Sequence, residues 1–415
     1  MAYNLEPVFN PKSIAIIGAS GSTQKFKYSE RPLRNLIKHG YKGKLYPVNP
    51  QYETIHGLTS YKSIKDIPDE VEAAISLLPA RYTLDLVKDC AEKGVKVVFI
   101  LSSGYGELSS EGEKLQNEIV KIGRENNMLI VGPNMNGIIS KYYSTIFSWA
   151  PVCEKEIKLG NVGIVTQSGN MLSAIVSRLQ QKNIGIAFSA TGGNEADVGF
   201  ADYLHYMASH EHVKDIVMFI EAIRKPDDFL KAVEVARKNN KNLYAIKIGK
   251  SDASSKAATA HTGALVGSDE TYDALFKREG IIRLRDLEEF VCAVSLSEYA
   301  NNENIDQLGI VAYSGGHSSL VADRCADYNI EIPEFSDLTK SRILEYFNKD
   351  KNILNPLDIE AYLPDNKPAL KVLSIMAEDD AIGGVVFCVG PLFDGVKEKL
   401  AHELNEAQQV FKEKG

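Results

Sequence analysis

His261 is the residue of this chain whose surroundings best suit nucleophilic chemistry. It is one of eight histidines, and it lies in a run of small residues from Ser254 to Asp269 that includes Gly263 and Gly267. Few side chains there could anchor a rigid core, so the run is typical of a mobile loop that offers one imidazole to more than one place. An imidazole can accept a phosphoryl group as well as a proton. From composition alone, a surface histidine is the other interpretation.

Glu221 is the candidate partner of that imidazole. A nucleophilic histidine needs one ring nitrogen fixed, so that the other nitrogen is free to attack. Glu221 directly follows the apolar run Val217–Ile220, which is typical of a strand. Its carboxylate would therefore stand at the carboxyl end of that strand, where it could orient His261.

Two turns rich in serine and glycine could each hold an inorganic phosphate. One follows the expected strand Asn161–Thr166, the other follows Ile186–Ser189, and a helix-like run comes after each. Free N–H groups and the dipole at the start of a helix favour an anion. The residues that we predict to bind phosphate are Ser168, Gly169, Asn170, Gly192 and Gly193. Helix capping and turn chemistry are the alternative, and a hydrolase nucleophile is disfavoured because Ser168 lacks the GxSxG signature.

A first glycine loop, near the N-terminus, suits a larger phosphate-bearing ligand. An apolar strand, Ile14–Ile17, runs into Gly18-Ala19-Ser20-Gly21, and small residues there let the backbone approach a phosphate. A NAD site would usually place a carboxylate at the end of the second strand. That strand ends instead in Asn49-Pro50, which disfavours NAD and leaves CoA open. Lys25 follows the loop and could meet CoA phosphates, or it is an ordinary surface lysine.

Two more turns fit the same ligand. Pro79 follows the third expected strand, and Ser102-Ser103-Gly104 follows the fourth. In an open α/β sheet, ligands bind outside the carboxyl ends of the strands. All of these turns would lie at that edge, so their agreement supports a CoA site.

The elements that must position these residues alternate between short apolar runs and longer amphipathic runs. The alternation predicts parallel, doubly wound α/β sheets. The expected strands are 13–17, 44–48, 73–78, 95–101 and 129–131, then 161–166, 186–189, 215–220, 242–248 and 280–283, and finally 307–312 and 382–389. Because the pattern restarts after polar stretches around 152–159 and 301–306, we expect three domains, over residues 1–135, 155–300 and 305–415.

The third domain looks unfinished in the sequence. After its last expected strand comes one helix-like run, 396–413, whereas a doubly wound unit normally returns with another strand. We hypothesise that the chain is a fragment of something longer, or that this sheet is completed elsewhere. A small terminal domain that ends on a helix is the alternative.

Composition excludes several other classes of protein. The chain has 415 residues and a net charge of -8, so a nucleic-acid role has no electrostatic support. Its five cysteines form no CxxC pair, which speaks against a metal site or a disulfide framework and fits reduced thiols. We find no signal peptide and no run of the ~20 apolar residues that a membrane helix needs. We therefore expect a cytoplasmic protein with no metal site and no membrane contact.

Several short segments stand in a fixed order along almost the full length of the chain. They are Ile17-Gly18-Ala19-Ser20, Tyr46-Pro47-Val48-Asn49-Pro50, Gly132-Pro133-Asn134, Gln167-Ser168-Gly169, Gly193-Asn194-Glu195-Ala196-Asp197-Val198, Ile220-Glu221, His261-Thr262-Gly263-Ala264-Leu265, Ser314-Gly315-Gly316 and Asn355-Pro356-Leu357-Asp358. This ordered set resembles the α-type portion of the ADP-forming acetyl-CoA synthetases. That group belongs to the NDP-forming acyl-CoA synthetase superfamily, which includes succinyl-CoA synthetase.

The resemblance implies a fold and a set of contacts. The fold is α/β, a Rossmann-like CoA-binding domain followed by two flavodoxin-like, doubly wound parallel-sheet domains, of which the last could be truncated. The first domain would bind CoA, and the resemblance adds Asn134 to its site. The full set of CoA-binding residues is then Gly18, Ala19, Ser20, Lys25, Asn49, Pro50, Pro79, Ser102, Ser103, Gly104 and Asn134.

The resemblance also implies a reaction. Acyl-CoA and phosphate would give an acyl phosphate and free CoA, and the acyl phosphate would then phosphorylate His261, with Glu221 orienting the imidazole. The phosphohistidine would pass its phosphoryl group to ADP at an ATP-grasp module that also holds Mg²⁺. That module is not evident in the sequence and would be a β subunit or a missing C-terminal domain. The substrate would be a small carboxylic acid, and we expect an oligomer.

The chain departs from the family pattern at three places. Met135-Asn136-Gly137 stands where Cys-Leu-Gly is usual, Asn170 replaces a small residue, and His317 follows Ser314-Gly315-Gly316. Asn136 and Asn170 could line the acyl pocket and favour a polar acid, or they could be neutral changes. We interpret His317 as a turn residue and not as a second catalyst.

Two other functions stay open beside the synthetase. A CoA-dependent acyl or carbamoyl transferase relative would keep the scaffold without ATP chemistry, but the presence of His261 speaks against it. A non-catalytic CoA-sensing module would need only the first domain, so the intact second domain counts against that function.

Overall fold

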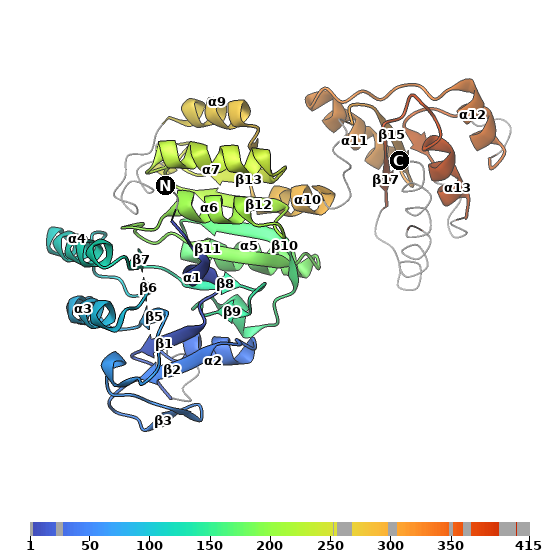
Figure 1. Ribbon diagram of the computed structural model, residues 1–415. Helices are drawn as coiled ribbons and strands as arrows, with labels where there is room; N and C mark the ends of the chain where they lie inside the picture. The colour runs from blue at the N-terminus through green and yellow to red at the C-terminus, as the bar shows by residue number, and fades with distance from the viewer. Residues whose placement is uncertain are drawn as a thin grey trace. The chain divides into compact units, whose positions relative to one another are not determined.

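The strands of this protein are short apolar runs, and most of their residues are buried. All five residues of β1 (Ser13–Ile17) are buried, for example. A parallel strand that is covered by helices on both faces needs such a continuous apolar run. The computed structural model describes residues 3–21, 28–251, 253–254, 268–297, 305–347, 352–359, 367–389 and 404. It divides the chain into two units, Met1–Tyr299 and Ala300–Gly415 (Figure 1).

The first sheet of the first unit has five parallel strands. In spatial order they are β2 (Lys44–Val48), β1, β5 (Ala73–Ser76), β6 (Val97–Ile100) and β7 (Leu129–Val131). All five were predicted from the sequence. The chain continues from β1 to one side and later resumes on the other side, so a topological switch point lies between β1 and β5. Ligands of open α/β sheets bind outside the carboxyl ends of the strands at such a point.

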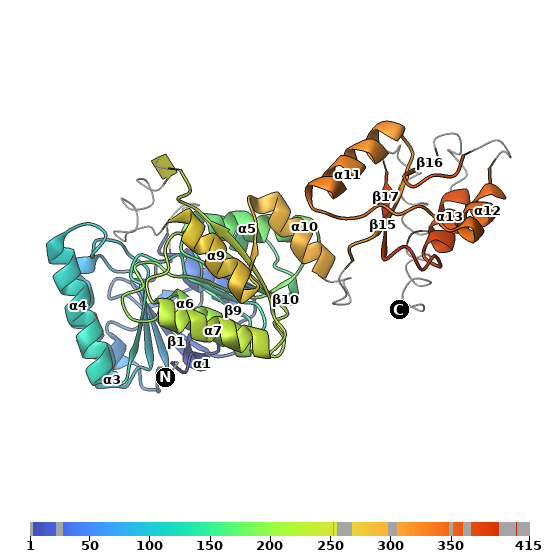
Figure 2. The ribbon, with the colours of Figure 1, turned by 90° about the horizontal axis from the view of Figure 1, so that it is seen from above.

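Helices cover both faces of this sheet. They are α1 (Glu6–Phe9), α2 (Arg31–Lys38), α3 (Thr83–Lys93) and α4 (Ser110–Glu125). The connections between β2 and α3 contain a small hairpin, β3 (Thr54–Ile55) and β4 (Leu58–Thr59), and the 3₁₀ turns η1 (Ile64–Asp66) and η2 (Ala80–Tyr82). Helices α3 and α4 lie side by side (Figure 2), and their buried residues Val87 and Ile119 pack with Val98 of β6. On the other face, Leu33 of α2 packs with Ile16 of β1.

The second sheet of this unit is mixed. In spatial order its strands are β14 (Ile282–Arg283), β13 (Asn242–Lys247), β12 (Asp215–Ile220), β10 (Leu159–Thr166), β11 (Ile186–Thr191), β8 (Ile138–Ser140) and β9 (Thr145–Ile146). The first five are parallel and were predicted. The antiparallel edge of β8 and β9 was not predicted. These two strands follow β7 of the first sheet along the chain, but they pair with β11 and form the edge of the second sheet.

The helices of the second sheet divide between its two faces. Their bounds are α5 (Gly169–Gln181), α6 (Phe200–Ser209), α7 (Pro226–Lys238), α9 (Asp269–Glu279) and α10 (Leu287–Ser297), and η3 (Pro151–Glu154) precedes β10. Leu172 of α5 and Phe290 of α10 share one core with Ile164 of β10. Leu204 of α6 and Val233 of α7 belong to the core of the opposite face.

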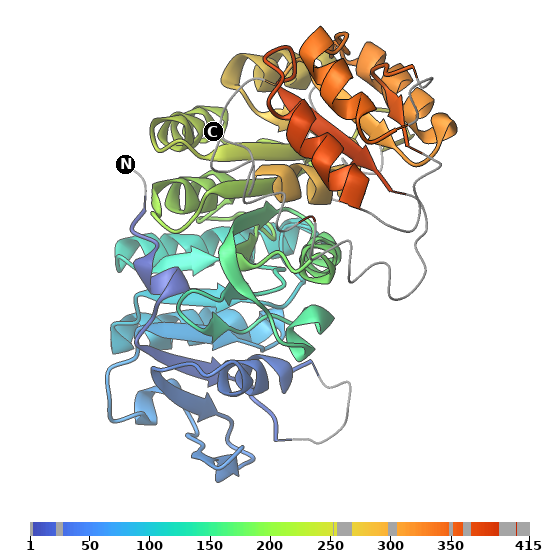
Figure 3. The ribbon, with the colours of Figure 1, turned by 90° about the vertical axis from the view of Figure 1, so that its right-hand side faces the viewer.

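One hydrophobic core spans both sheets of the first unit. Ile16 of β1, Val131 of β7 and Val165 of β10 all belong to a single buried cluster. An isolated parallel bridge joins Val131 to Val198 and continues the pairing from the first sheet toward the second. Figure 3 shows the two sheets of this unit one above the other, with the blue strands below the green ones. The two sheets therefore hold a fixed relation to each other.

The second unit contains a parallel sheet of three strands among its described residues. They are β16 (Leu357–Asp358), β15 (Leu308–Ala312) and β17 (Gly384–Cys388), with helices α11 (Gly315–Asp327), α12 (Asp337–Leu344) and α13 (Lys367–Met376). His317 is exposed in the first turn of α11, and not in a turn as we had predicted. We predicted that this sheet lacks a returning strand after residue 389. Of that part of the chain, the structure describes only residue 404. Across the described ranges, no helix combines the length and the apolar character needed to cross a membrane.

Asp197 fastens β7 from the side of the second sheet. Its buried carboxylate accepts hydrogen bonds from the Ile130 backbone N–H (3.2 Å), from Arg124 Nε (3.2 Å) and from the Tyr3 hydroxyl (2.9 Å). Burial and the neighbouring carboxylate raise the pKa of Tyr3 to about 12, so Tyr3 stays a donor at neutral pH.

We predict that Asp197→Ala lowers the free energy of unfolding of the first unit by about 1–3 kcal/mol, because the buried N–H of Ile130 loses its acceptor. Urea unfolding followed by the fluorescence of Trp149, the only tryptophan of the chain, measures this change. The control is Arg124→Ala, whose side chain is 61% exposed and whose loss should cost no more than about 1 kcal/mol. Equal costs for the two variants would contradict the assignment.

Candidate active site

A cavity of about 670 Å³ lies in the first unit, among the turns that follow the carboxyl ends of strands from both sheets. Six of the predicted site residues line it: Asn134, Ser168, Gly169, Asn170, Gly193 and Glu221. They follow β7, β10, β11 and β12. Because all of these strands end at the same region of the unit, residues far apart in sequence meet in one cavity.

Ser168 is the N-cap residue that precedes α5, but its side chain makes no capping hydrogen bond. The turn is held instead by Thr166, whose Oγ1 accepts from the Ser168 N–H (3.0 Å) and donates to the Ser168 carbonyl (3.0 Å). The alternative that the Ser168 hydroxyl serves as a helix cap is therefore wrong. This hydroxyl stands at the N-terminus of a 13-residue helix, where the dipole favours an anion.

Gln167 fixes the position of Glu221, and our sequence analysis missed this role. The buried amide of Gln167 accepts the backbone N–H of Glu221 (2.7 Å) and that of Ala222 (3.0 Å) through Oε1. Its Nε2 donates to the Ala222 carbonyl (2.7 Å) and to Glu195 Oε1 (2.6 Å). The end of β12 is thereby clamped to the end of β10. A glutamine directly after a largely apolar strand was the available signal.

Glu195 lies beneath the second predicted phosphate turn. Its carboxyl group is buried, and burial raises its pKa against the opposing effects of Gln167 and Arg224. A Cβ on Gly192 would stand 2.9 Å from Glu195 Oε1, so a larger residue there would require the Glu195 side chain to shift. Oε1 of this carboxyl group accepts from Gln167 and its Oε2 accepts from the Phe200 N–H (3.2 Å), so both oxygens are engaged by donors beneath the turn.

Arg224 supplies a positive charge to the cavity and was also missed. It lines the cavity three residues after Glu221, and its Nη1 donates to the carbonyl of Asn194 (3.1 Å). A basic residue in a loop at the carboxyl edge of a sheet was the signal that could have found it. Hydrogen bonds between a guanidinium and phosphate oxygens are among the stronger ones in proteins.

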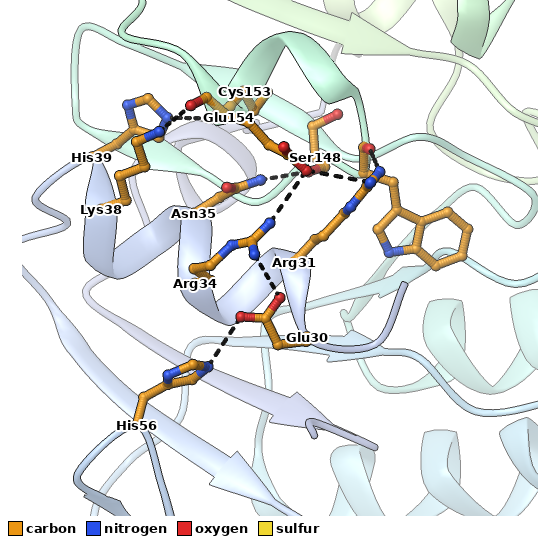
Figure 4. A network of polar contacts seen from close by, with 11 residues as sticks. Glu30, Arg31, Arg34, Asn35, Lys38, His39, His56, Ser148, Cys153 and Glu154 are labelled. Atoms are coloured by element: carbon orange, nitrogen blue, oxygen red, sulfur yellow. Dashed lines mark hydrogen bonds and ion pairs between the residues drawn. The ribbon is translucent and has the colours of Figure 1, made fainter. Parts of the chain in front are cut away.

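The far wall of the cavity depends on α2. Arg31, which is mostly buried, lines the cavity and donates from Nη1 to the carbonyl of Trp149 (2.9 Å), while its Nη2 pairs with Glu154 Oε1 (3.2 Å) (Figure 4). Asn35 donates to the Ser148 carbonyl (2.9 Å) in the same network. These contacts fasten the first sheet's helix to the segment that enters η3, and they hold Trp149 in place.

Asn136 and Asn170, the two departures from the family pattern, both line the cavity. Asn136 Nδ2 donates to the Gly169 carbonyl (2.8 Å), and its own backbone N–H donates to Thr191 Oγ1 (3.0 Å). Asn136 therefore ties both predicted phosphate turns to the segment after β7. A Cβ on Gly169 would stand 3.0 Å from the Asn136 Cβ, which leaves little room for a larger residue there.

Most of the predicted CoA residues lie at the carboxyl edge of the first sheet and outside this cavity. They are Gly18, Ala19, Ser20, Asn49, Pro50, Pro79, Ser102, Ser103 and Gly104, and the phosphate-turn residue Gly192 also does not line the cavity. Asn49 Nδ2 donates to the Ala19 carbonyl (2.8 Å), so the second turn holds the first. The Asn134 N–H donates to the Ser102 carbonyl (2.9 Å). That bond links the predicted CoA turn at Ser102 to the cavity.

His261 and Lys25 lie outside the described residues. The strand that leads to the His261 segment is β13, and its last residue, Lys247, pairs with Ile220, the neighbour of Glu221. Lys247 is buried with its Nζ 4.5 Å from the centroid of the Tyr272 ring, and burial lowers the pKa of its ammonium group. β13 therefore lies beside β12, the strand that Glu221 directly follows.

The comparisons with known proteins agree with this geometry. Residues 12–141 match the family model "CoA binding domain", and residues 159–297 match the "Succinyl-CoA ligase like flavodoxin domain". The α subunit of ADP-forming acetate–CoA ligase II from Pyrococcus furiosus is 32% identical over 396 residues, which cover 94% of this chain and 84% of that subunit. The α subunit of its isoenzyme I is 33% identical over 363 residues and is covered to 76%.

A longer relative and a solved structure give the same picture. The ADP-forming acetate–CoA ligase of Methanocaldococcus jannaschii is 35% identical over 357 residues, which are 86% of this chain but 49% of that protein. The chain thus spans about half the length of that relative. The structure of the dinucleotide-forming acetyl-coenzyme A synthetase 1 of Ca. Korarchaeum cryptofilum, in complex with phosphate and ADP, matches with a TM-score of 0.86 at 27% identity, over 97% of this chain and 86% of that one.

These matches define an α/β protein with a Rossmann-like CoA-binding part and a flavodoxin-like part. The chain belongs to the family of the ADP-forming acetate–CoA ligase α subunits.

Gly193 allows the second predicted phosphate turn to approach the first sheet. Its φ is +57°, and a Cβ there would stand 2.2 Å from the carbonyl oxygen of Pro133. Gly40 has a similar φ of +73°, but nothing lies within 4 Å of its position.

We predict that Gly193→Ala destabilises the first unit more than Gly40→Ala does. Both variants force a residue with a Cβ into the left-handed region, which costs about 1–2 kcal/mol, but only Gly193→Ala adds a clash with backbone. Urea unfolding followed by Trp149 fluorescence compares them. A cost for Gly193→Ala no greater than that for Gly40→Ala would show that the two turns do not approach so closely.

Proposed function

We propose that this chain is the CoA-binding and phosphoryl-carrying part of an ADP-forming acyl-CoA synthetase. The observation that carries the proposal is the cavity itself, in which Ser168, Gly193 and Arg224 surround a space suited to phosphate beside Glu221. Asn134 connects that space to the carboxyl edge of the CoA-binding sheet. The names of the family's members, which are ADP-forming ligases, support the same function.

In the proposed reaction these residues act one after another. A phosphate oxygen, held by the two turns and Arg224, attacks the thioester carbonyl of acyl-CoA, the C–S bond breaks, and CoA leaves as the thiolate. A ring nitrogen of His261 then attacks phosphorus, and the carboxylate leaves. Glu221 accepts a hydrogen bond from the other ring nitrogen and stabilises the positive charge on the imidazole. In the reverse direction, ATP drives the synthesis of the thioester.

The second half of the reaction needs an ATP-grasp module that binds ADP or ATP with Mg²⁺. Two relatives that match most of this chain are named α subunits, which supports a separate partner subunit for this chain too. We propose an ATP-grasp β subunit, or an ATP-grasp domain that follows in a longer chain, and an oligomer built with it. We also propose that residues 1–135, 155–300 and 305–415 are the three domains and that the protein works in the cytoplasm.

The acyl substrate that we propose is a small carboxylic acid. The relatives include ligases named for acetate and for 4-hydroxybutyrate and a trans-feruloyl-CoA synthase, so the same scaffold serves acids of different size. The transferase and the CoA sensor are distinguished from the synthetase by one property. Neither would form a phosphohistidine.

We predict that incubation with acyl-CoA and labelled inorganic phosphate puts an acid-labile phosphoryl group on the wild-type chain and none on His261→Ala. CoA release, followed with a thiol reagent across a panel of acyl-CoAs, identifies the acid. We expect Glu221→Gln to label about 10²–10⁴-fold more slowly, because the imidazole loses its orienting carboxylate. Glu113→Gln, at another carboxylate of the cavity wall, is the matched control and should label at the normal rate.

The absence of label with every thioester, in a chain that still binds CoA, would exclude the synthetase and leave the transferase or the sensor. Label on both the wild type and His261→Ala would place the phosphoryl group on another residue.

We predict that Arg224→Ala raises the KM for phosphate by about 10–100-fold, because a hydrogen bond between charged groups contributes about 1.5–3 kcal/mol. Arg224→Lys keeps the charge and should recover part of the loss. Initial rates of CoA release at varied phosphate concentration measure both variants. An unchanged KM in Arg224→Ala would show that the guanidinium does not meet the phosphate.

A further inference from the structure

Asn194 stands next to Gly193 in the second phosphate turn. All of its side-chain hydrogen-bonding groups contact residues that belong to the first sheet or to the segments beside it. Its Nδ2 donates to Glu107 Oε2 and to Gln116 Oε1 (2.9 Å), and its Oδ1 accepts from Asn134 Nδ2 (3.4 Å). A primary amide offers two N–H donors and one carbonyl oxygen. Both donors and the oxygen of Asn194 are therefore engaged, and all three partners line the same cavity.

Glu107 extends this contact to the predicted CoA turn. Its Oε1 accepts the backbone N–H of Gly104 (2.6 Å) and that of Tyr105 (3.2 Å), while its Oε2 accepts from Asn194. Partial burial opposes the charge on Glu107, but the hydrogen bonds from Asn194, Gly104 and Tyr105 together lower the pKa of its carboxyl group. Glu107 thus acts as an ionised acceptor between the two turns, with two backbone donors on the CoA side and the Asn194 amide on the phosphate side.

The backbone of Asn194 joins it to the other parts of the cavity. Its N–H donates to the Pro133 carbonyl (2.9 Å), and its carbonyl accepts from Arg224 Nη1 (3.1 Å). A continuous set of hydrogen bonds therefore runs from Gly104 through Glu107 and Asn194 to Arg224, the residue to which we assign phosphate.

We propose that Asn194 is a positioning residue that couples the CoA turn to the phosphate turn, so that CoA and phosphate each strengthen the binding of the other. The proposal rests on the proposed function, because it takes the two turns to be the CoA and phosphate sites. A ligand at the Ser102–Gly104 turn fixes Glu107 through its two backbone hydrogen bonds. Glu107 in turn fixes Asn194, and the adjoining Gly193 and Arg224 are then ordered before phosphate binds.

The role differs from a merely structural clasp. Asp197, three residues further on, also joins the two sheets, but it holds Arg124, Tyr3 and the Ile130 N–H, none of which lines the cavity. Loss of a clasp lowers stability alone. Loss of a positioning residue changes how one ligand affects the binding of the other.

The test reverses the polarity of the hydrogen bond between residues 107 and 194. In Asn194→Asp a carboxylate faces the carboxylate of Glu107, so attraction becomes repulsion. In the double variant Asn194→Asp/Glu107→Gln, the new amide keeps an oxygen for the N–H groups of Gly104 and Tyr105 and directs its N–H₂ to the new aspartate. The amides of Gln116 and Asn134 can rotate so that each directs an N–H to the new aspartate. Glu107→Gln alone is the matched control and should have the smaller effect, because amides can turn.

The measurement is the affinity for inorganic phosphate by calorimetry, with and without saturating CoA, a pair that does not react. We expect CoA to tighten phosphate binding by about 5-fold or more in the wild type, the lower end of ordinary coupling between sites. We expect Asn194→Asp to bring this ratio to within about 2-fold of unity, and the double variant to restore most of it. The rate of phosphohistidine formation from acyl-CoA should follow the same order.

Three results would overturn the coupling. The first is no coupling in a wild-type chain that forms phosphohistidine, which leaves the proposed function standing. The second is an Asn194→Asp variant that couples as the wild type does. The third is a double variant no better than Asn194→Asp, with unfolding by Trp149 fluorescence unchanged in both. A wild-type chain that forms no phosphohistidine overturns the proposed function, and the coupling falls with it.

Discussion

Three backbone hydrogen bonds hold the segment after β11 against the end of β7. They join the N–H of Asn194, Ala196 and Val198 to the carbonyls of Pro133, Gly132 and Ile130, at 2.9, 3.1 and 3.2 Å. This short ladder determines which turns of the two sheets meet. Each parallel sheet by itself places its turns at one carboxyl edge, and this pairing aligns the edge of the CoA-binding sheet with the edge that carries Glu221.

The charges around the cavity are arranged to accept an anion in spite of several carboxylates. Arg224 and the helix N-terminus at Ser168 favour negative charge. Glu195, which lies beneath the second turn, is buried, and its two oxygens accept hydrogen bonds from Gln167 and from the Phe200 N–H. Glu107 stays ionised, but its oxygens are engaged by backbone and amide N–H groups. The oxygens of both carboxyl groups are therefore occupied by N–H donors where phosphate would lie.

Local patterns in the sequence were sufficient to predict most strands and the turns that follow them. Each strand is a separate apolar run. Glu221 directly follows such a run and Ser168 stands two residues after one, so their place at a carboxyl edge depends on neighbours in the chain alone. The antiparallel β8 and β9 were missed because their sheet lies beyond the expected domain boundary. An edge strand that pairs across a boundary leaves no mark in its own residue types.

The residues that were missed share one property. Gln167, Arg224 and Asn194 act through partners that are 28 to 87 positions away in sequence. A glutamine or an asparagine in a polar turn has many possible partners, and only the packing of the two sheets selects among them. The expectations for His261 and Lys25 lie outside the described residues.

The core that spans both sheets of the first unit has a consequence for how such genes can recombine. Ile16, Val131 and Val165 belong to one buried cluster, although they come from different sheets. A crossover between β7 and β10 would join halves whose apolar surfaces had not been matched, and the hybrid would expose or overcrowd that cluster. The CoA-binding half and the half with Glu221 are therefore expected to be inherited as one block, so exchange between lineages should swap both together.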